Sequence, residues 1–127
     1  MIKPELNFTL LRRIQLSRKR GWTMPPNTVK ADRSTGFGNP YRVSLAKSRD
    51  GKPLDKPWVV ESNAHAIMWM FATKDEATAA AVRLFTETMT DHMKDKVRLA
   101  LKGKNIACWC STGSPCHADV LLEIANR

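Results

Sequence analysis

The chain has 127 residues, of which 43% are hydrophobic and 26% are charged, and its formal net charge at pH 7 is +9. A chain of this length and composition can form one hydrophobic core, so we expect a single domain over residues 1–127. No apolar run is long enough to span a membrane, the first residues lack the apolar core of a signal peptide, and three cysteines confined to residues 108–116 are not a disulfide framework. The expected location is therefore the cytoplasm, without membrane contact.

The positive charge favours a polyanionic partner, and we expect a nucleotide or a nucleic acid. Basic residues are concentrated in residues 12–20 and again in residues 94–104. Arg18 belongs to the first run and Trp22 follows it, so these two side chains are candidates for contacting a phosphate and stacking on a base. The alternative is that the basic side chains only solvate an ordinary surface.

The first half of the chain is predicted to contain short strands joined by long loops. Alternating or apolar patterns predict strands at Thr9–Leu16, Tyr41–Leu45, Trp58–Val60 and Ala66–Phe71. Between the first two, Ser17–Pro40 contains so many Gly, Pro and Asn residues that we expect a loop there.

The end of this loop, Ala31–Tyr41, combines two glycines, an arginine, two hydroxyl side chains and an Asn-Pro turn. The planar guanidinium of Arg33 can bind a phosphate or a carboxylate, and Asn39 can recognise a polar edge of a ligand. Glycine lets the backbone come close to a bound molecule. The binding candidates in this segment are Arg33, Ser34, Thr35, Gly38 and Asn39. A tight turn that leads into the next strand, without a ligand, is the alternative.

The second half is predicted to be mainly helical. Thr73 and Glu76 form a capping box that starts a helix, whose apolar positions are Ala77, Ala81, Leu84, Phe85 and Thr88. Asp91 is predicted to cap a second helix, which ends at Gly103, and Lys104–Cys110 alternates as a strand. The expected fold class is α/β or α+β, with one small sheet covered by helices mainly from the C-terminal half.

All three cysteines lie in a strand–turn–helix pattern that covers residues 104–126. Cys108 and Cys110 are predicted to share one face of the strand. Ser114-Pro115 suits the N-cap and first position of the helix, so that Cys116 and His117 open it. We therefore expect three thiols, an imidazole and the free N–H groups of a helix start to meet at one corner.

Three interpretations of this corner remain open. In an anion or reactive-group site, Ser111–Ser114 and the helix start bind phosphate, and Cys108, Cys116 or His117 acts as nucleophile or proton carrier. A zinc site would use the same three residues together with Cys110, although adjacent ligands on one helical turn are strained. Simple packing of buried thiols explains one or two cysteines well and the whole cluster poorly.

Two motifs also carry a family resemblance. The first comprises Ile14–Arg18, Arg20–Trp22 with Pro25, Asp32–Thr35 and Gly38–Tyr41, and the second comprises Ala107–Cys110 and Pro115–Leu122. Together they resemble an uncharacterised phage and bacterial family, the domain-of-unknown-function family numbered 4326, over about Ile14 to Asn126. The resemblance implies that both motifs belong to one domain and that the setting is a bacterial cytoplasm, that of the host for a phage protein. It implies no reaction.

These observations predict one pocket between the Gly38-Asn39-Pro40 loop and the cysteine corner. The favoured function is binding, with chemical processing, of a nucleotide, a nucleoside derivative or a nucleic-acid end; an enzymatic role is favoured without a reaction class. The catalytic candidates are Cys108, Cys116 and His117, no cofactor is assigned, and the binding candidates are Arg18, Trp22, Arg33, Ser34, Thr35, Gly38, Asn39, Ser111, Ser114 and Asp119.

The alternative is a non-catalytic nucleic-acid-binding module stabilised by zinc at Cys108, Cys110, Cys116 and His117. A third alternative is a phage protein that binds a host protein through its basic loop.

Overall fold

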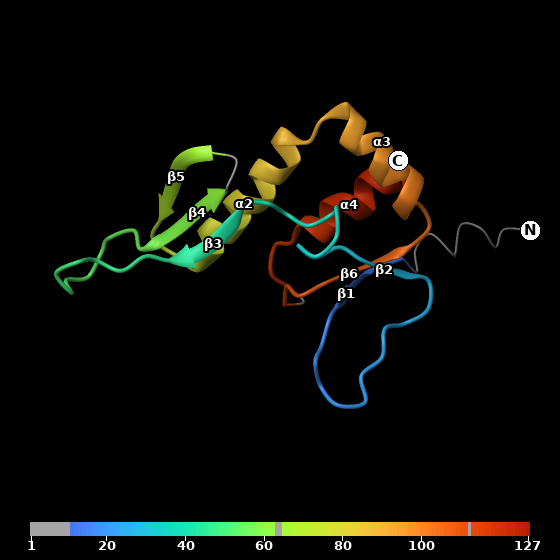
Figure 1. Cartoon of the computed structure of the whole chain (residues 1–127), viewed down its shortest axis with the longest axis horizontal. Helices are drawn as coiled ribbons and strands as arrows, with labels where there is room; N and C mark the ends of the chain where they lie inside the picture. Colours follow the sequence, from blue (N-terminus) through green and yellow to red (C-terminus); the bar gives the residue numbers. More distant parts are fainter. Residues whose placement is uncertain (1–10, 63–64, 112) are drawn as a thin grey trace, which may run out of the picture.

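A computed structural model describes residues 11–62, 65–111 and 113–127 of the chain (Figure 1). These residues form two three-stranded sheets and three helices, and all three helices lie in the second half of the sequence, so the fold is α+β. The strands are β1 (Arg13–Gln15), β2 (Thr28–Lys30), β3 (Arg42–Leu45), β4 (Trp58–Ser62), β5 (His65–Phe71) and β6 (Asn105–Cys108). The helices are α2 (Lys74–Thr88), α3 (Asp91–Leu101) and α4 (His117–Ala125).

The first sheet is parallel and has the order β1-β6-β2. Ile106 of the central strand pairs with Arg13 on one side and with Val29 on the other. Strand β2 lies inside the segment that was predicted to be a loop, so that part of the prediction was wrong. Its three residues form a strand by pairing with β6, which is far away in the sequence. The predicted first strand is shorter than expected, and its first two residues, 9 and 10, lie outside the described residues.

Both faces of β6 are covered, and its side chains alternate between two apolar clusters. Ile106 and Cys108 belong to the main core, whereas Ala107 packs with Ile14 and Leu16 in a smaller cluster beneath Trp22. This is the alternation that the sequence predicts for a strand. The strand ends at Cys108 rather than at Cys110. Helices α3 and α4 lie together on one side of this sheet (Figure 1).

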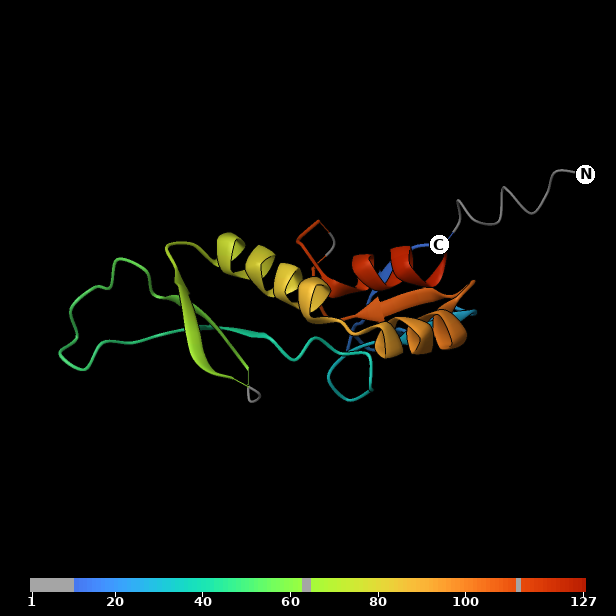
Figure 2. The same cartoon turned by 90° about the horizontal axis from the view of Figure 1, so that it is seen from above.

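The second sheet is antiparallel, with the order β3-β4-β5, and α2 packs against it. The predicted capping box is present, since Thr73 Oγ1 accepts a hydrogen bond from Glu76 N at 3.2 Å. The buried face of α2 comprises Ala77, Ala80, Ala81 and Phe85. Thr88, predicted to be on that face, is exposed and its hydroxyl donates to a helix carbonyl instead. Figure 2 shows α2 leading from this sheet to the start of α3.

Two helix starts differ from the sequence prediction. Thr90, not Asp91, caps α3, because its hydroxyl accepts from Met93 N at 3.2 Å. The N-cap of α4 is Cys116 rather than Ser114, and its Sγ accepts from Ala118 N at 3.4 Å. Pro115 therefore lies outside the helix.

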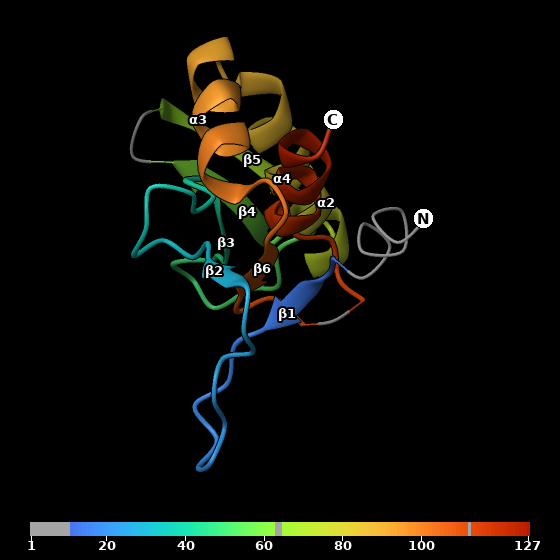
Figure 3. The same cartoon turned by 90° about the vertical axis from the view of Figure 1, so that its right-hand side faces the viewer.

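Two loops extend from the body of the molecule. The β1–β2 loop carries exposed Arg18, Lys19 and Arg20 and projects away from the sheets and helices (Figures 1 and 3). The β3–β4 loop carries exposed Lys47, Arg49 and Lys52 and extends in another direction (Figure 2). None of the described helices has the length and apolar character needed to cross a membrane.

The segment Asp32–Tyr41, which connects β2 to β3, folds tightly on itself. The Asp32 carboxylate accepts from the backbone N–H and the hydroxyl of Ser34, and the Asp32 carbonyl accepts from Thr35 Oγ1 at 3.0 Å. The far end of the loop returns so closely that a Cβ on Gly38 would lie 2.5 Å from the Asp32 carbonyl oxygen. The glycine at this position therefore serves the loop's own packing.

We predict that Gly38→Ala destabilises the protein by about 1–3 kcal/mol, the usual cost of forcing extra volume against fixed atoms. The atoms that the new methyl group would meet belong to the backbone of Asp32 and Arg33 and have little room to move. Gly36→Ala is the matched control, because its Cβ would meet only the flexible Lys96 Nζ, at 3.2 Å. Urea denaturation of the three proteins measures the difference, and equal midpoints for the two variants would contradict this account.

Candidate functional site

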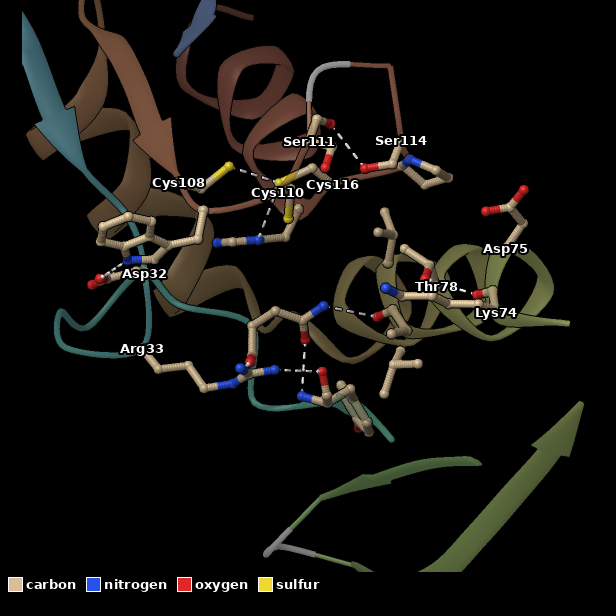
Figure 4. Close-up of a pocket in the computed structure, with 18 of the residues that line it drawn as sticks. Asp32, Arg33, Lys74, Asp75, Thr78, Cys108, Cys110, Ser111, Ser114 and Cys116 are labelled. Carbon is tan, nitrogen blue, oxygen red and sulfur yellow. Dashed lines mark hydrogen bonds between the residues drawn. The ribbon is translucent and has the colours of Figure 1, made fainter. Parts of the chain in front are cut away.

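One pocket lies between the Asp32–Tyr41 loop, helix α2 and the corner formed by the end of β6 and the start of α4 (Figure 4). Its cavity has a volume of about 630 Å³. The two sequence motifs, far apart in the chain, thus contribute to one site. The polar, ionisable and sulfur-containing side chains that line it are Asp32, Arg33, Ser34, Asn39, Tyr41, Lys74, Asp75, Thr78, Trp109, Ser111, Ser114, the three cysteines and His117.

The three cysteine sulfurs gather at one end of this pocket. Cys108 is buried at the end of β6, Cys116 is buried at the start of α4, and Cys110 is half-buried in the bend between them. All three Sγ atoms lie within 4.8 Å of one another, and those of Cys108 and Cys116 are 3.0 Å apart. The cysteines are free, so the cluster consists of thiols rather than a disulfide.

The thiols influence one another's ionisation. Hydrogen bonds from Cys108 and Cys116 hold the pKa of the Cys110 thiol far below its usual range. Hydrogen bonding to Cys108 and then to Cys110, together with burial, raises the pKa of Cys116, and the contact with Cys110 raises the pKa of Cys108. The first negative charge of the cluster therefore resides on Cys110, the most accessible of the three.

His117 is held in a defined tautomer beside these sulfurs. Its Nε2 lies 2.6 Å from the carbonyl oxygen of Ala31, and a carbonyl accepts only, so Nε2 carries the proton. In the neutral ring, Nδ1 then keeps its lone pair, and this atom lies 3.6 Å from Cys116 Sγ. The imidazole is thus oriented to accept a thiol proton or to bind a metal ion.

Within the Asp32–Tyr41 loop, two of the five residues predicted to contact a ligand, Arg33 and Asn39, are largely engaged with protein. Arg33 donates from Nε to the Asn39 carbonyl at 3.0 Å and from Nη2 to the Tyr41 carbonyl at 3.3 Å. The amide of Asn39 donates to Ala81 O and accepts from Tyr41 N, and this residue is buried. Asn39 therefore fastens the loop to α2, while Arg33 retains Nη1 without a hydrogen bond to the described residues.

Trp109 is the exposed aromatic residue at the pocket, beside the buried Tyr41, and it was not among the residues predicted from the sequence. Its Nε1 donates to the Asp32 carboxylate at 2.9 Å, and the Arg18 guanidinium lies 4.3 Å from its ring centroid. The side chain is nevertheless 39% exposed. The available signal was a large aromatic residue between two cysteines. It was missed because the predicted strand extended to Cys110, which placed Trp109 on the face opposite the cysteines, whereas the strand ends at Cys108.

The turn between Cys110 and Cys116 is fixed mainly by its own bonds and by Arg13. Ser114 donates to the Ser111 carbonyl from its backbone N–H and from its hydroxyl, and Gly113 has a φ of +97°, which favours glycine. Arg13 donates to the carbonyls of Ser111 and Ser114 and pairs with Asp119 at 2.9 Å. Arg13 was another residue missed, since only the pairing of β1 with β6 brings it there.

Other predicted residues lie elsewhere. Trp22 packs in the small cluster on the far face of β6, and Asp119 binds Arg13 without lining the pocket. In their place, α2 contributes Lys74 and Thr78 to the lining, and no sequence pattern associates these two residues with the motifs.

We predict that Asp32 gives the protein a pH-dependent stability. Hydrogen bonds from Ser34, Trp109 and Lys30 lower the pKa of this carboxyl group from 3.8 to about 2. Because the folded-state pKa is depressed, the contribution is complete above pH 3.8 and is lost as the pH falls toward 2. Urea unfolding between pH 5 and about 2 should show a smaller loss for Asp32→Asn than for the wild type. Asp55→Asn, which leaves the Asp32 carboxylate intact, should follow the wild type, and equal slopes for all three would refute the assignment.

Comparison with known proteins identifies a family and no function. Residues 14–127 match the family described as Domain of unknown function (DUF4326), so both motifs and every element of the site fall within the match or at its edge. No curated protein and no solved structure is significantly similar to the chain. Since the match covers nearly the whole chain, this protein belongs to the DUF4326 family.

Proposed function

We propose that the pocket binds a nucleotide or a nucleoside derivative. The observation that carries this proposal is the placement of an exposed aromatic ring, Trp109, beside the cationic side chains of Arg33 and Lys74 and the thiol–imidazole cluster around one cavity. The volume of about 630 Å³ is within the range of about 300–1,000 Å³ typical of small-molecule sites. The net charge of +9 favours ligands that carry negative charge.

Trp109 supplies a stacking surface that is already oriented. The bond to Asp32 and the stacked Arg18 restrict the rotation of the indole, so little side-chain entropy remains to be lost on binding. Stacking of one base on an aromatic side chain contributes about 1–3 kcal/mol. Any base can use such a surface, so Trp109 gives affinity rather than selectivity among bases.

Positively charged groups on two sides of the pocket would bind the phosphate of the ligand. Arg33 keeps Nη1 for a phosphate, Lys74 lies at the start of α2, and the first turn of α4 begins at the cluster. Asp32 and Asp75 also line the cavity, so its net charge is small and the aromatic surface is essential. Chemical processing of the ligand would depend on Cys108, Cys116 and His117, which form one end of the pocket.

We expect calorimetric titration to detect binding of a nucleoside monophosphate, and to detect weaker or no binding of ribose 5-phosphate, which lacks a base. Trp109→Ala should raise the Kd by about 5- to 100-fold, whereas Trp109→Phe keeps an aromatic face and should lose less. Lys74→Ala should also weaken binding, and Lys102→Ala, an exposed lysine outside the pocket, is its control. Failure of the four common monophosphates and their nucleosides to bind at millimolar concentration would refute the proposal.

The projecting β1–β2 loop favours a second candidate function, binding of a nucleic acid. Arg18, Lys19 and Arg20 are exposed on this loop, and Arg18 also stacks on Trp109 at the pocket. A nucleic-acid end with its last base at Trp109 would therefore have its phosphodiester backbone next to three cations. In this function the pocket binds a terminal nucleotide rather than a free one.

A salt titration tests this second function. If the loop contacts phosphates, replacing Arg18, Lys19 and Arg20 together by alanine should reduce the slope of log affinity against log salt by about 2–3, because about one counterion is released per phosphate neutralised. The control variant removes three charges from the other exposed loop, at Lys47, Arg49 and Lys52. Equal slopes for the two triple variants would exclude a specific role for the β1–β2 loop.

A further inference from the structure

We propose that Cys108, Cys110 and Cys116 bind a zinc-class metal ion as thiolates, with Nδ1 of His117 as the fourth ligand. The inference goes beyond the proposed ligand binding, because metal content and ligand binding are measured separately and either can fail alone. Four protein ligands close the coordination sphere of the ion, so with metal bound the cluster stabilises the fold, and chemical processing by Cys108, Cys116 and His117 is limited to the metal-free protein.

The spacing of the ligand atoms supports this assignment. A tetrahedral zinc ion with Zn–S bonds of about 2.3 Å and a Zn–N bond of about 2.0 Å separates its ligand atoms by about 3.5–3.8 Å. The three Sγ atoms lie within 4.8 Å of one another, and His117 Nδ1 lies 3.6 Å from Cys116 Sγ. The Cys108 and Cys116 sulfurs, at 3.0 Å, are closer than ligands of one ion, so binding requires them to separate slightly. They are also farther apart than the roughly 2.05 Å of a disulfide bond.

The atoms around the cluster support a metal ion as well. Histidine ligands usually donate their other N–H to a carbonyl or carboxylate, and the bond from His117 Nε2 to Ala31 O at 2.6 Å has this arrangement. The Ala118 N–H donates to Cys116 Sγ at 3.4 Å, and such bonds stabilise the negative charge of a bound thiolate. These two bonds orient the His117 ring and the Cys116 sulfur as metal ligands.

The chemistry of the cluster limits the type of metal. Soft thiolates and an imidazole favour zinc over magnesium or calcium, which require oxygen ligands. Within the described residues, the cluster whose ligand atoms already lie close together contains the three cysteines, without a carboxylate and without His117, so the fourth bond requires the imidazole to move toward the other two sulfurs. Cys108 lies at the end of a buried strand, Cys116 and His117 lie at the start of a helix, and Cys110 lies in the bend between them, next to the Ser111 carbonyl that Arg13 binds.

The test uses the full chain, expressed in medium supplemented with zinc and purified without chelator. Elemental analysis should find about one zinc per chain, and a chelator should lower the Tm, because the free energy of metal binding adds to that of folding. Replacement of zinc by cobalt should produce intense thiolate-to-cobalt charge-transfer absorption together with the visible bands of a tetrahedral site.

Variants identify the ligands. Cys110→Ser changes the half-buried cysteine and therefore disturbs the core least, and it should lose most of the metal. His117→Ala should weaken metal affinity at least tenfold, while His92→Ala, which removes an exposed histidine of α3, should retain it. Unchanged affinity in His117→Ala would overturn the assignment of the fourth ligand.

Other outcomes overturn the site itself. Protein that contains well under one zinc per chain, takes up no cobalt and has a Tm unaffected by chelator has no such site. Detection of a disulfide between Cys108 and Cys116 by mass spectrometry of the freshly purified protein would overturn it too. The cobalt spectrum of the wild-type protein keeps the test decisive if a cysteine variant fails to fold.

Discussion

The hydrogen bond between the Ala31 carbonyl and His117 Nε2 joins the parts from which the pocket is built. Ala31 follows β2, precedes the Asp32–Tyr41 loop and is fully buried. Its N–H donates to the Ala107 carbonyl of β6 at 2.8 Å, while its C=O accepts from the imidazole at the start of α4. One residue thus connects sheet, loop and helix. A buried carbonyl left without a partner costs about 1–3 kcal/mol, so this connection is strongly favoured.

The same bond gives the site its chemical character. By holding the proton on Nε2, it leaves Nδ1 directed toward the sulfurs, whether the cluster acts as thiols or as metal ligands. The two interpretations of the cysteine corner therefore require the same arrangement of His117. They differ in whether the three sulfurs are free thiols or metal-bound thiolates. Residue types and spacing are the same in both cases, so the sequence alone left both interpretations open.

The parts of the fold that were predictable from sequence depend on local interactions. The Thr73 capping box and the alternation of Ile106, Ala107 and Cys108 involve neighbours in the chain, and both are present. Strand β2 was missed because its three residues have little pattern of their own and depend on pairing with β6. Ser114 was a reasonable N-cap by residue type, but its hydroxyl is engaged by the Ser111 carbonyl, a bond that the sequence does not reveal.

The candidate site shows the same division. The sequence identified the cysteine cluster and the loop opposite it, since unusual residue types mark both. It did not show which polar groups are already bound to protein. The Asn39 amide donates a hydrogen bond to α2, whereas tertiary contacts bring Trp109 and Lys74 to the pocket and Arg13 to the turn beside it. Residue type indicates what a side chain can do, and the fold determines which partners are left for it.

The parallel sheet also constrains the order in which the protein can form. Among the described residues, β1 and β2 each pair with β6 alone, and β6 is the last strand to leave the ribosome. At about 5–20 residues per second, the two early strands wait on the order of seconds for their partner. During that time their edges are unpaired and open to association with other chains, a situation that chaperones relieve. Synthesis of residues 105–125 then completes the sheet, the core and the cysteine cluster together, so a chain that has reached only residue 104 contains no assembled site.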